Sequence, residues 1–264
     1  MSIPVPLPPR PDLAFAPDPG RPKASWSWYV AIGVYLLAFL LGALATVPVL
    51  AASGQLGKPS QGSGVDAAGA WATIVADVVI TGVLIFWLAT WHKRWRESVG
   101  LSEPGKRLRN WLWGYAVGLA LYPVVALGVG VILTLLFQAV SGHQVRSPDQ
   151  VASHLSANGV VAVVLLSLVV APVSEEFFFR GILFRSLRDR YGFWVGAIGS
   201  ALAFGLVHYV PNVPLRDALL LQTTMVFTGI GLAWIYERRG TLIADIGAHM
   251  AFNTIGIVLI LLLK

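Results

Sequence analysis

The sequence APVSEEFFFRG, residues 171–181, decides how this chain folds, because it places three charged side chains inside an apolar segment. It directly follows the apolar run 159–170, so Glu175, Glu176 and Arg180 lie in a segment that otherwise has the composition of a membrane-spanning helix. An ionised side chain in hydrocarbon costs about 3 kcal/mol or more, and such groups usually face a bundle interior and carry function. We therefore expect other spans to supply polar partners.

The composition indicates a membrane protein. Of the 264 residues, 56% are hydrophobic and only 12% are charged, whereas a soluble domain carries about 25% charged residues. The net charge of +6 is explained by lysine and arginine at the inner leaflet, so we expect no nucleic-acid partner. The absence of cysteine excludes disulfides, thiol catalysis and thiolate metal sites. The expected fold class is all-α, a polytopic transmembrane helical bundle.

Seven apolar segments predict the spans, and an eighth would arise if a long one were broken. Their approximate ranges are 26–50, 70–91, 111–140, 159–187, 193–210, 218–236 and 242–263. Pro123 predicts a tilt or kink in the third span. Residues 1–24 hold eight of the sixteen prolines and are expected to form a disordered cytoplasmic tail, with the transmembrane domain at 25–264.

The distribution of basic residues predicts the orientation. If the N-terminus is cytoplasmic, the cytoplasmic side receives fourteen lysines and arginines and the outside receives four. We therefore expect a multi-pass protein of a bacterial cell membrane, with the N-terminus in the cytoplasm and the C-terminus outside.

Three of the last four predicted spans carry polar residues at overlapping depths. At about 1.5 Å per residue, Glu175 lies about 18 Å from the cytoplasmic end of its span, His208 about 22 Å and His249 about 12 Å. Independent structural residues would have little reason to coincide in this way. These side chains are therefore expected to form one site in the membrane.

The spacing within the helices predicts how the site divides. Glu176 and Arg180 are four residues apart and can form an ion pair, whereas Glu175 projects about 100° away. His249 and Asn253 are also four residues apart and project together. We expect arginine to neutralise one carboxylate, and the other to face two imidazoles and an amide.

That second group suits two chemistries. A buried glutamate can act as general base on a water molecule while imidazole and amide groups stabilise an oxyanion. Alternatively, Glu175, His208 and His249 are a known type of zinc ligand set, with water in the fourth position.

Three motifs in this order resemble those of the CPBP family of intramembrane proteases, which includes the CAAX prenyl endopeptidases and proteins linked to bacteriocin maturation and self-immunity. The similarity covers about residues 159–253, and its motifs are Glu175-Glu176-x3-Arg180, Phe204-x3-His208 and His249-x3-Asn253.

The resemblance implies hydrolysis of peptide bonds in a membrane-associated peptide or protein. It implies that Glu175 activates water with help from His208, and that His249 and Asn253 support the oxyanion. Glu176 and Arg180 would hold the site together. The glutamate-type mechanism requires no cofactor, and a divalent metal such as zinc is the alternative.

Several residues have competing interpretations. Asp245, four residues before His249, is interpreted as an ordinary interfacial aspartate more readily than as a group that orients the histidine. Asp77 and Pro123 would suit a proton-coupled transporter, although no inverted repeat accompanies them. A non-catalytic scaffold is the third hypothesis. The three phenylalanines at 177–179 are expected to be packing or lipid-facing residues and not substrate-binding ones.

Overall fold

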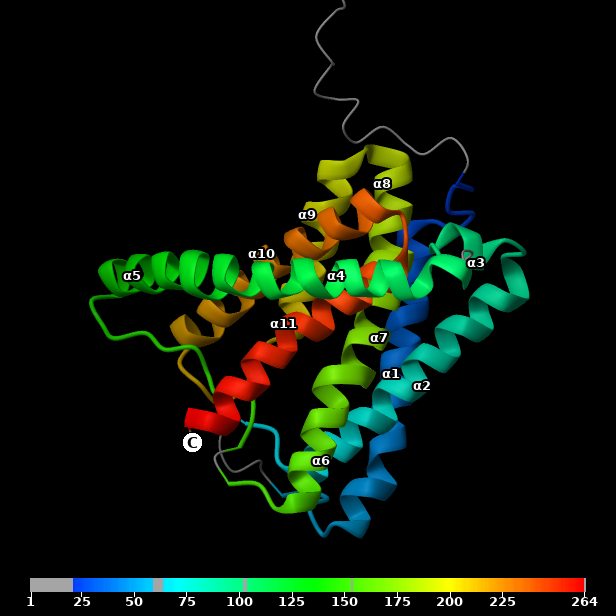
Figure 1. Cartoon of the computed structure of the whole chain (residues 1–264). Helices are drawn as coiled ribbons and strands as arrows, with labels where there is room; N and C mark the ends of the chain where they lie inside the picture. The colour runs from blue at the N-terminus through cyan, green and yellow to red at the C-terminus, as the bar shows by residue number, and fades with distance from the viewer. Residues whose placement is uncertain (1–20, 59–63, 102–103, 153, 264) are drawn as a thin grey trace, which may run out of the picture.

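The computed structural model describes residues 21–58, 64–101, 104–152 and 154–263, which are predominantly helical (Figure 1). The α-helices are α1 (Trp28–Ala52), α2 (Ala67–Trp91), α3 (Trp95–Ser98), α4 (Arg107–Tyr122), α5 (Gly130–Ser141), α6 (Ala157–Leu165), α7 (Ala171–Glu176), α8 (Arg185–Tyr191), α9 (Phe193–Val207), α10 (Leu215–Arg239) and α11 (Leu242–Leu263). A 3₁₀ turn, η2 (Pro104–Lys106), precedes α4. No β-strand occurs in these ranges, so the predicted all-α class is confirmed.

Six helical segments are long and apolar enough to cross a membrane. They are Trp28–Ala52, Ala67–Trp91, Pro104–Ser141, Ala157–Tyr191, Leu215–Arg239 and Leu242–Leu262. The remaining predicted segment, 193–210, corresponds to α9, which has only 15 residues. At 1.5 Å per residue it is about 22 Å long, less than the roughly 30 Å of a hydrocarbon core. The chain is a multi-pass membrane protein.

Helix α9 ends earlier than its apolar composition predicts. The expected segment reached residue 210, but the helix stops at Val207 and His208 forms its C-cap. The ring Nδ1 of His208 lies 2.7 Å from the carbonyl oxygen of Phe204, which would otherwise lack a partner at the helix end. The polypeptide then turns away before Pro211.

Three π-helical stretches interrupt the two longest helical segments. The stretch η3 (Pro123–Val129) joins α4 to α5, because a proline has no N–H and clashes with the carbonyl of the preceding turn. The stretches η4 (Leu166–Val170) and η5 (Phe177–Phe184) lie on either side of α7. Single π turns often mark functional sites, and here two of them enclose the two glutamates.

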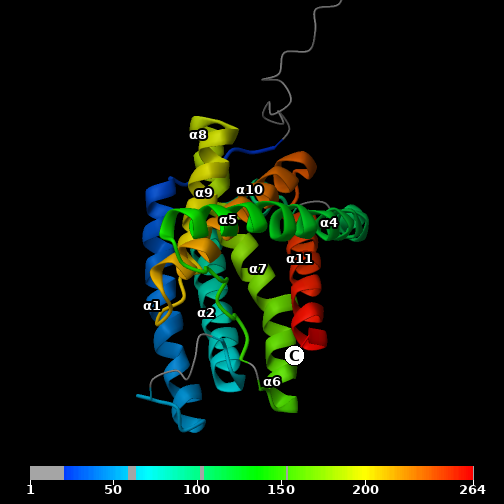
Figure 2. The ribbon, with the colours of Figure 1, turned by 90° about the vertical axis from the view of Figure 1, so that its left-hand side faces the viewer.

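The helices cross at different angles around the centre of the molecule. The axes of α1, α2 and the continuous segment from α6 to α8 are broadly aligned, while α4, η3 and α5 cross them in both views (Figures 1 and 2). Helix α11 packs against α4 on one side and against η4 and α7 on another. It therefore brings its polar residues next to the glutamates.

Small residues allow α4 and α11 to approach closely. A Cβ atom added at Gly114 would lie 1.8 Å from the carbonyl oxygen of Ala244, and one at Gly118 would lie 2.1 Å from that of Ala248. Each helix therefore presents a pair of small residues four positions apart, the usual solution for close helix pairs in membranes. No larger residue fits at either glycine without moving α11, which carries His249 and Asn253.

The segment η5 lies at the centre of the core. All eight of its residues are buried, which confirms that Phe177, Phe178 and Phe179 are packing residues. The ring of Tyr35 in α1 stacks on Phe178 with 3.8 Å between centroids. The indole Nε1 of Trp26, just before α1, donates a hydrogen bond to the carbonyl of Ile182 at 3.1 Å.

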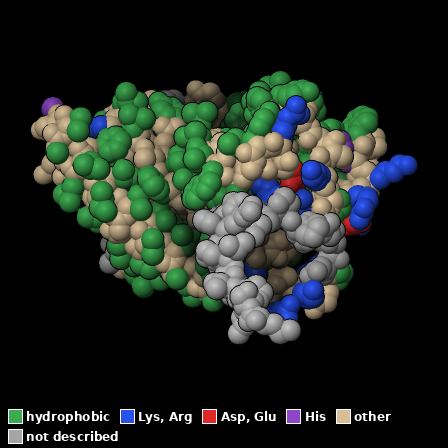
Figure 3. Space-filling view, turned by 90° about the horizontal axis from the view of Figure 1, so that it is seen from above, with side chains coloured by type: hydrophobic (Ala, Val, Ile, Leu, Met, Phe, Trp, Pro, Cys, Tyr) green, Lys and Arg blue, Asp and Glu red, His purple; other side chains and the backbone are tan. Residues whose placement is uncertain are grey.

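One end of the molecule carries the N-terminal segment and several arginines. Arg21 donates to the carbonyl of Ser98 at 3.1 Å, and Arg185 donates to the carbonyl of Pro22 at 2.9 Å. Figure 3 looks onto this end and shows lysine and arginine side chains gathered on one part of a largely hydrophobic surface. Residues 1–20 of the expected tail lie outside the described residues, whereas Arg21–Ala24 contact the bundle.

Loops of the other end also contact one another. An isolated β-bridge joins Val65 to Val151, and the backbone N–H of Arg146 donates to Asp217 at 3.2 Å. The loops that the sequence assigned to one side of the membrane are thus close together. That this side faces outward stays a prediction.

Candidate active site

Glu175 and Glu176 are the last two residues of α7 and occupy different environments. The side chain of Glu176 is fully buried, whereas that of Glu175 is 23% exposed. They differ because successive side chains project about 100° apart around an α-helix.

Arg180 binds Glu176 as the sequence predicted. Its Nη1 atom donates to Oε1 of Glu176 at 3.0 Å, and both side chains are fully buried. Its Nη2 atom donates to the carbonyl of Gly229 in α10 at 3.2 Å, and its guanidinium lies 4.5 Å from the ring centroid of Phe204 in α9. Arg180 thereby connects three helical segments at the depth of the glutamates.

His249 contacts both glutamates, and this corrects the predicted division of the site. Its Nδ1 lies 2.6 Å from Oε1 of Glu176, and its Nε2 lies 3.8 Å from Oε2 of Glu175. The sequence assigned this histidine to Glu175 alone. Because a carboxylate only accepts hydrogen bonds, the hydrogen resides on Nδ1, and the Nε2 atom is directed to Glu175.

Asp245 does not bind the ring of His249, because Glu176 occupies that position. It is nevertheless fully buried in the first turn of α11, so the expectation of a solvated aspartate is wrong. The four-residue spacing revealed its proximity to the site but not its contacts.

His208 and His249 both contact the ring of Phe204. The centroid of Phe204 is 4.6 Å from that of His208 and 5.9 Å from that of His249. The carbonyl of Phe204 binds Nδ1 of His208 at 2.7 Å and therefore fixes the hydrogen there, which leaves its Nε2 as the acceptor. The sequence motif identified Phe204 without revealing that its ring contacts both histidines.

Asn253 contacts the helical segment that carries the glutamates, but its hydrogen bond is to another residue of that segment. Its Nδ2 donates to the carbonyl of Ser167 in η4 at 2.8 Å. An amide nitrogen has two hydrogens, so one donor and the side-chain oxygen are left for other partners. The half-buried amide thereby links α11 to the π-helical stretch before α7.

Two residues from the first helices also lie within electrostatic range of Glu175. Asp77 of α2 and Tyr35 of α1 are each close enough to Glu175 for an electrostatic interaction. Asp77 was an unexplained polar residue in the sequence, and Tyr35 carried no signal because an aromatic residue is ordinary in a span. The surroundings of Glu175 thus extend beyond the three motifs.

The proposed metal ligands do not form a metal-binding group in this arrangement. Among the residues that the structure describes, no three histidine, cysteine, aspartate or glutamate side chains converge in a way that could hold an ion. The Nδ1 atoms of His249 and His208 bind Glu176 and a carbonyl, so the Nε2 atom of each ring is the one left for another partner. We therefore derive no step through a metal.

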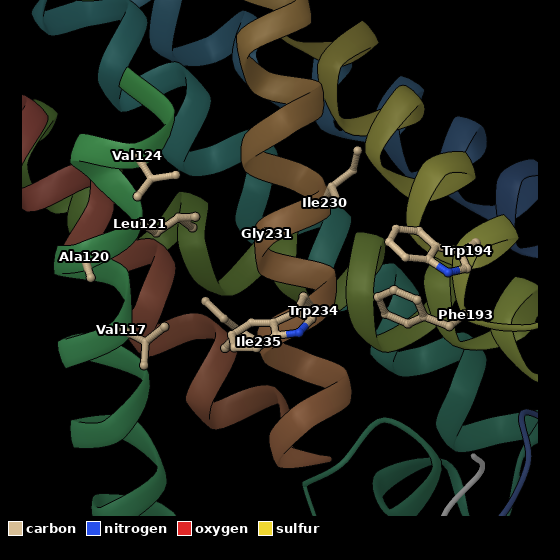
Figure 4. A pocket seen from close by; sticks show the side chains of 10 residues that line it. All are labelled: Val117, Ala120, Leu121, Val124, Phe193, Trp194, Ile230, Gly231, Trp234 and Ile235. Atoms are coloured by element: carbon tan, nitrogen blue, oxygen red, sulfur yellow. The ribbon is translucent and has the colours of Figure 1, made fainter. Parts of the chain in front are cut away.

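A cavity of about 400 Å³ lies elsewhere in the bundle, between α4, η3, α9 and α10 (Figure 4). Its lining is apolar, with Leu121, Ile230 and Trp234 among the residues that face it. No acid, base or amide side chain lines it, so its chemistry differs from that of the glutamate–histidine cluster.

Comparisons with known proteins match the part of the chain that contains these residues. Residues 157–255 match the family model described as "Type II CAAX prenyl endopeptidase Rce1-like". The chain is 25% identical over 246 residues to the "Putative membrane peptidase YdiL" of Bacillus subtilis (strain 168), and the match covers 88% of each chain. It is 29% identical over 100 residues to an "Uncharacterized 24.3 kDa protein" of Escherichia coli, which covers 37% of this chain and 44% of that protein. No solved structure matches the chain.

Proposed function

Because residues 157–255 identify the chain as a member of the CPBP family of intramembrane proteases, we propose that it hydrolyses peptide bonds with a glutamate-activated water molecule. Its substrates would be membrane-associated peptides or proteins, cleaved within a bacterial cell membrane. The proposed orientation places the N-terminus in the cytoplasm, as the distribution of basic residues predicts.

The observation that carries this proposal is the contact between Glu175 and His249. Oε2 of Glu175 lies 3.8 Å from Nε2 of His249, in a side chain that is partly open, while Glu176 holds the other ring nitrogen. A carboxylate in this position can take a proton from water. The Nε2 atom of the histidine is left facing the reacting groups.

The remaining steps follow from the residues around Glu175. The hydroxyl oxygen of the water attacks the carbonyl carbon of the substrate, and the proton of the water passes to Glu175. The C–N bond then breaks as Glu175 returns that proton to the leaving amine, so the carboxylate is regenerated. His208 assists the first step, because its Nε2 is the free acceptor of that ring.

His249 and Asn253 support the negative charge on the substrate oxygen. His249 donates from Nε2 when its ring has taken up a second proton from bulk water before the attack, and the carboxylate of Glu176 stabilises that imidazolium through Nδ1–H. The second amide hydrogen of Asn253 is available as a further donor, because the first binds Ser167. The ion pair between Glu176 and Arg180 stabilises this position of His249 and does not contact the substrate.

Cleavage of a quenched peptide library by the purified protein in lipid tests this function. We expect Glu175→Gln to lower the rate by about 10²–10⁴-fold, the usual contribution of a general base, with an unchanged thermal midpoint. Glu97→Gln is the matched control, because that glutamate is 40% exposed and pairs with Arg94 on α3.

The same assay with a chelator separates the two chemistries. Cleavage that persists with chelator and is lost in Glu175→Gln supports the glutamate mechanism. Cleavage that is lost with chelator and restored by zinc contradicts it in favour of a metal-dependent protease. Near-normal turnover by Glu175→Gln would remove Glu175 from the mechanism altogether.

A further inference from the structure

Four buried carboxylate oxygens receive no hydrogen bond from any donor that the structure describes. One is Oε2 of the partly exposed Glu175, and the other three are Oδ1 and Oδ2 of Asp245 and Oε2 of Glu176. The side chains of Asp245 and Glu176 are completely buried. Buried polar atoms normally have partners, and an ionised carboxylate without any costs several kcal/mol in real proteins.

The two carboxyl groups face each other. Asp245 and Glu176 lie within hydrogen-bonding reach, although one is on α11 and the other on α7. Two carboxylates in that position would repel each other and would have no hydrogen to share. A carboxylic acid next to a carboxylate has an O–H donor and a charged acceptor, the combination that gives strong hydrogen bonds.

The other contacts of Glu176 determine which oxygen needs that donor. Its Oε1 accepts from Nη1 of Arg180 at 3.0 Å and from Nδ1 of His249 at 2.6 Å. Its Oε2 is left, and Asp245 is the group within reach. One proton on Asp245 supplies the donor for Oε2 and removes the charge from the two orphaned oxygens of Asp245.

Charge neutrality leads to the same arrangement. Arg180 is fully buried and carries one positive charge, which a single ionised carboxylate balances. With His249 neutral, ionisation of both Glu176 and Asp245 would leave one net negative charge in the bundle interior. A neutral Asp245 leaves the network balanced while His249 is neutral.

We propose that Asp245 is a positioning residue, held as the neutral acid, which donates a hydrogen bond to Oε2 of Glu176 and thereby fixes the orientation of His249. This inference rests on the proposed protease function for its catalytic consequence and on the buried hydrogen-bond network for its chemistry. Asp245 acts on the histidine through Glu176 and does not touch the substrate.

Two substitutions at this position test the donor. Asp245→Asn keeps the size of the side chain and supplies an N–H without a charge, so we expect kcat within about threefold of the wild type. Asp245→Leu keeps the branched shape of the side chain, with a larger volume and no donor, and we expect kcat to fall by about 10²-fold with little change in KM, because a misplaced catalytic group has effects of this size. Thermal midpoints measured for both variants show that each is folded.

An infrared spectrum tests the protonation without any cleavage. We expect a carboxylic-acid carbonyl band that disappears in Asp245→Asn and persists in Glu175→Gln. A wild-type spectrum without a band assignable to Asp245 would overturn the proposal, as would an Asp245→Asn variant as inactive as Asp245→Leu. If the wild type cleaves no peptide, the protease function fails while the infrared band still decides the state of Asp245.

Discussion

Glu175 and Glu176 have identical side chains and are adjacent in α7, yet they belong to two different regions of the site. The region behind Glu176 is closed, because Arg180 and His249 both bind its fully buried carboxylate. The region in front of Glu175 is open, because that side chain is partly exposed and its neighbour His249 stays 3.8 Å away. Adjacent residues on one helix can therefore have different roles, one stabilising the structure and the other taking part in the reaction.

His249 is the residue that joins the two regions. One ring nitrogen binds the closed side and the other faces the open side. A substitution confined to the closed region should therefore change stability first, one in the open region should change activity alone, and one at His249 should change both.

The largest effect is expected from Arg180→Met. This change keeps much of the length of the side chain but leaves the buried carboxylate of Glu176 without its counter-ion, which costs about 3–5 kcal/mol. We expect a severe loss of folded protein from membranes and a lower thermal midpoint for whatever remains. Fluorescence-detected size-exclusion chromatography with a temperature series measures both quantities.

Arg94→Met provides the matched control. Arg94, the N-cap of α3, also pairs with a glutamate three residues away, but its side chain is 65% exposed. Exposed pairs contribute little to stability, so we expect no measurable shift in the thermal midpoint. Equal behaviour of the two variants would contradict the assignment of Arg180 to the closed region.

An intermediate effect is expected from the two histidines, and it separates the regions. His249→Ala should lower the rate of peptide cleavage by about 10²-fold or more, and should also destabilise the protein by about 1–3 kcal/mol because Glu176 loses a donor. His208→Ala should lower the rate to a similar degree but cost less than about 1 kcal/mol in stability, because its ring binds only a carbonyl of its own helix end. Parallel rate and unfolding measurements test this, and equal destabilisation by the two variants would contradict it.

The sequence predicted the parts of this site that depend on helix geometry. A spacing of four residues was enough to pair Glu176 with Arg180, because neighbouring turns of one helix fix that distance. The free-energy cost of placing charged side chains in hydrocarbon was enough to predict that polar residues from different spans converge. Both arguments use only local geometry and the properties of the bilayer.

The contacts between helices could not be predicted in the same way. The position of His249 between the glutamates depends on how closely α11 approaches α4, which Gly114 and Gly118 permit but no periodicity reveals. The premature end of α9 at Val207 was missed for a similar reason, since the segment stays apolar beyond the helix. The role of Trp26 was also absent from the sequence pattern, because its partner is a backbone carbonyl far along the chain.

The smallest effect is expected from Trp26→Phe, which tests where the closed region ends. The substitution keeps an aromatic ring in a site that is only 6% exposed but removes the donor to the carbonyl of Ile182 in η5. One lost hydrogen bond costs about 1 kcal/mol, so the thermal midpoint should fall slightly. Trp91→Phe is the control, because that indole is 64% exposed at the end of α2.

Cleavage by Trp26→Phe should stay at the wild-type rate, since the surroundings of Glu175 are unchanged. A fall in rate at unchanged stability would show that the N-terminal segment acts on the open region through η5, and the division between the two glutamates would then extend beyond α7.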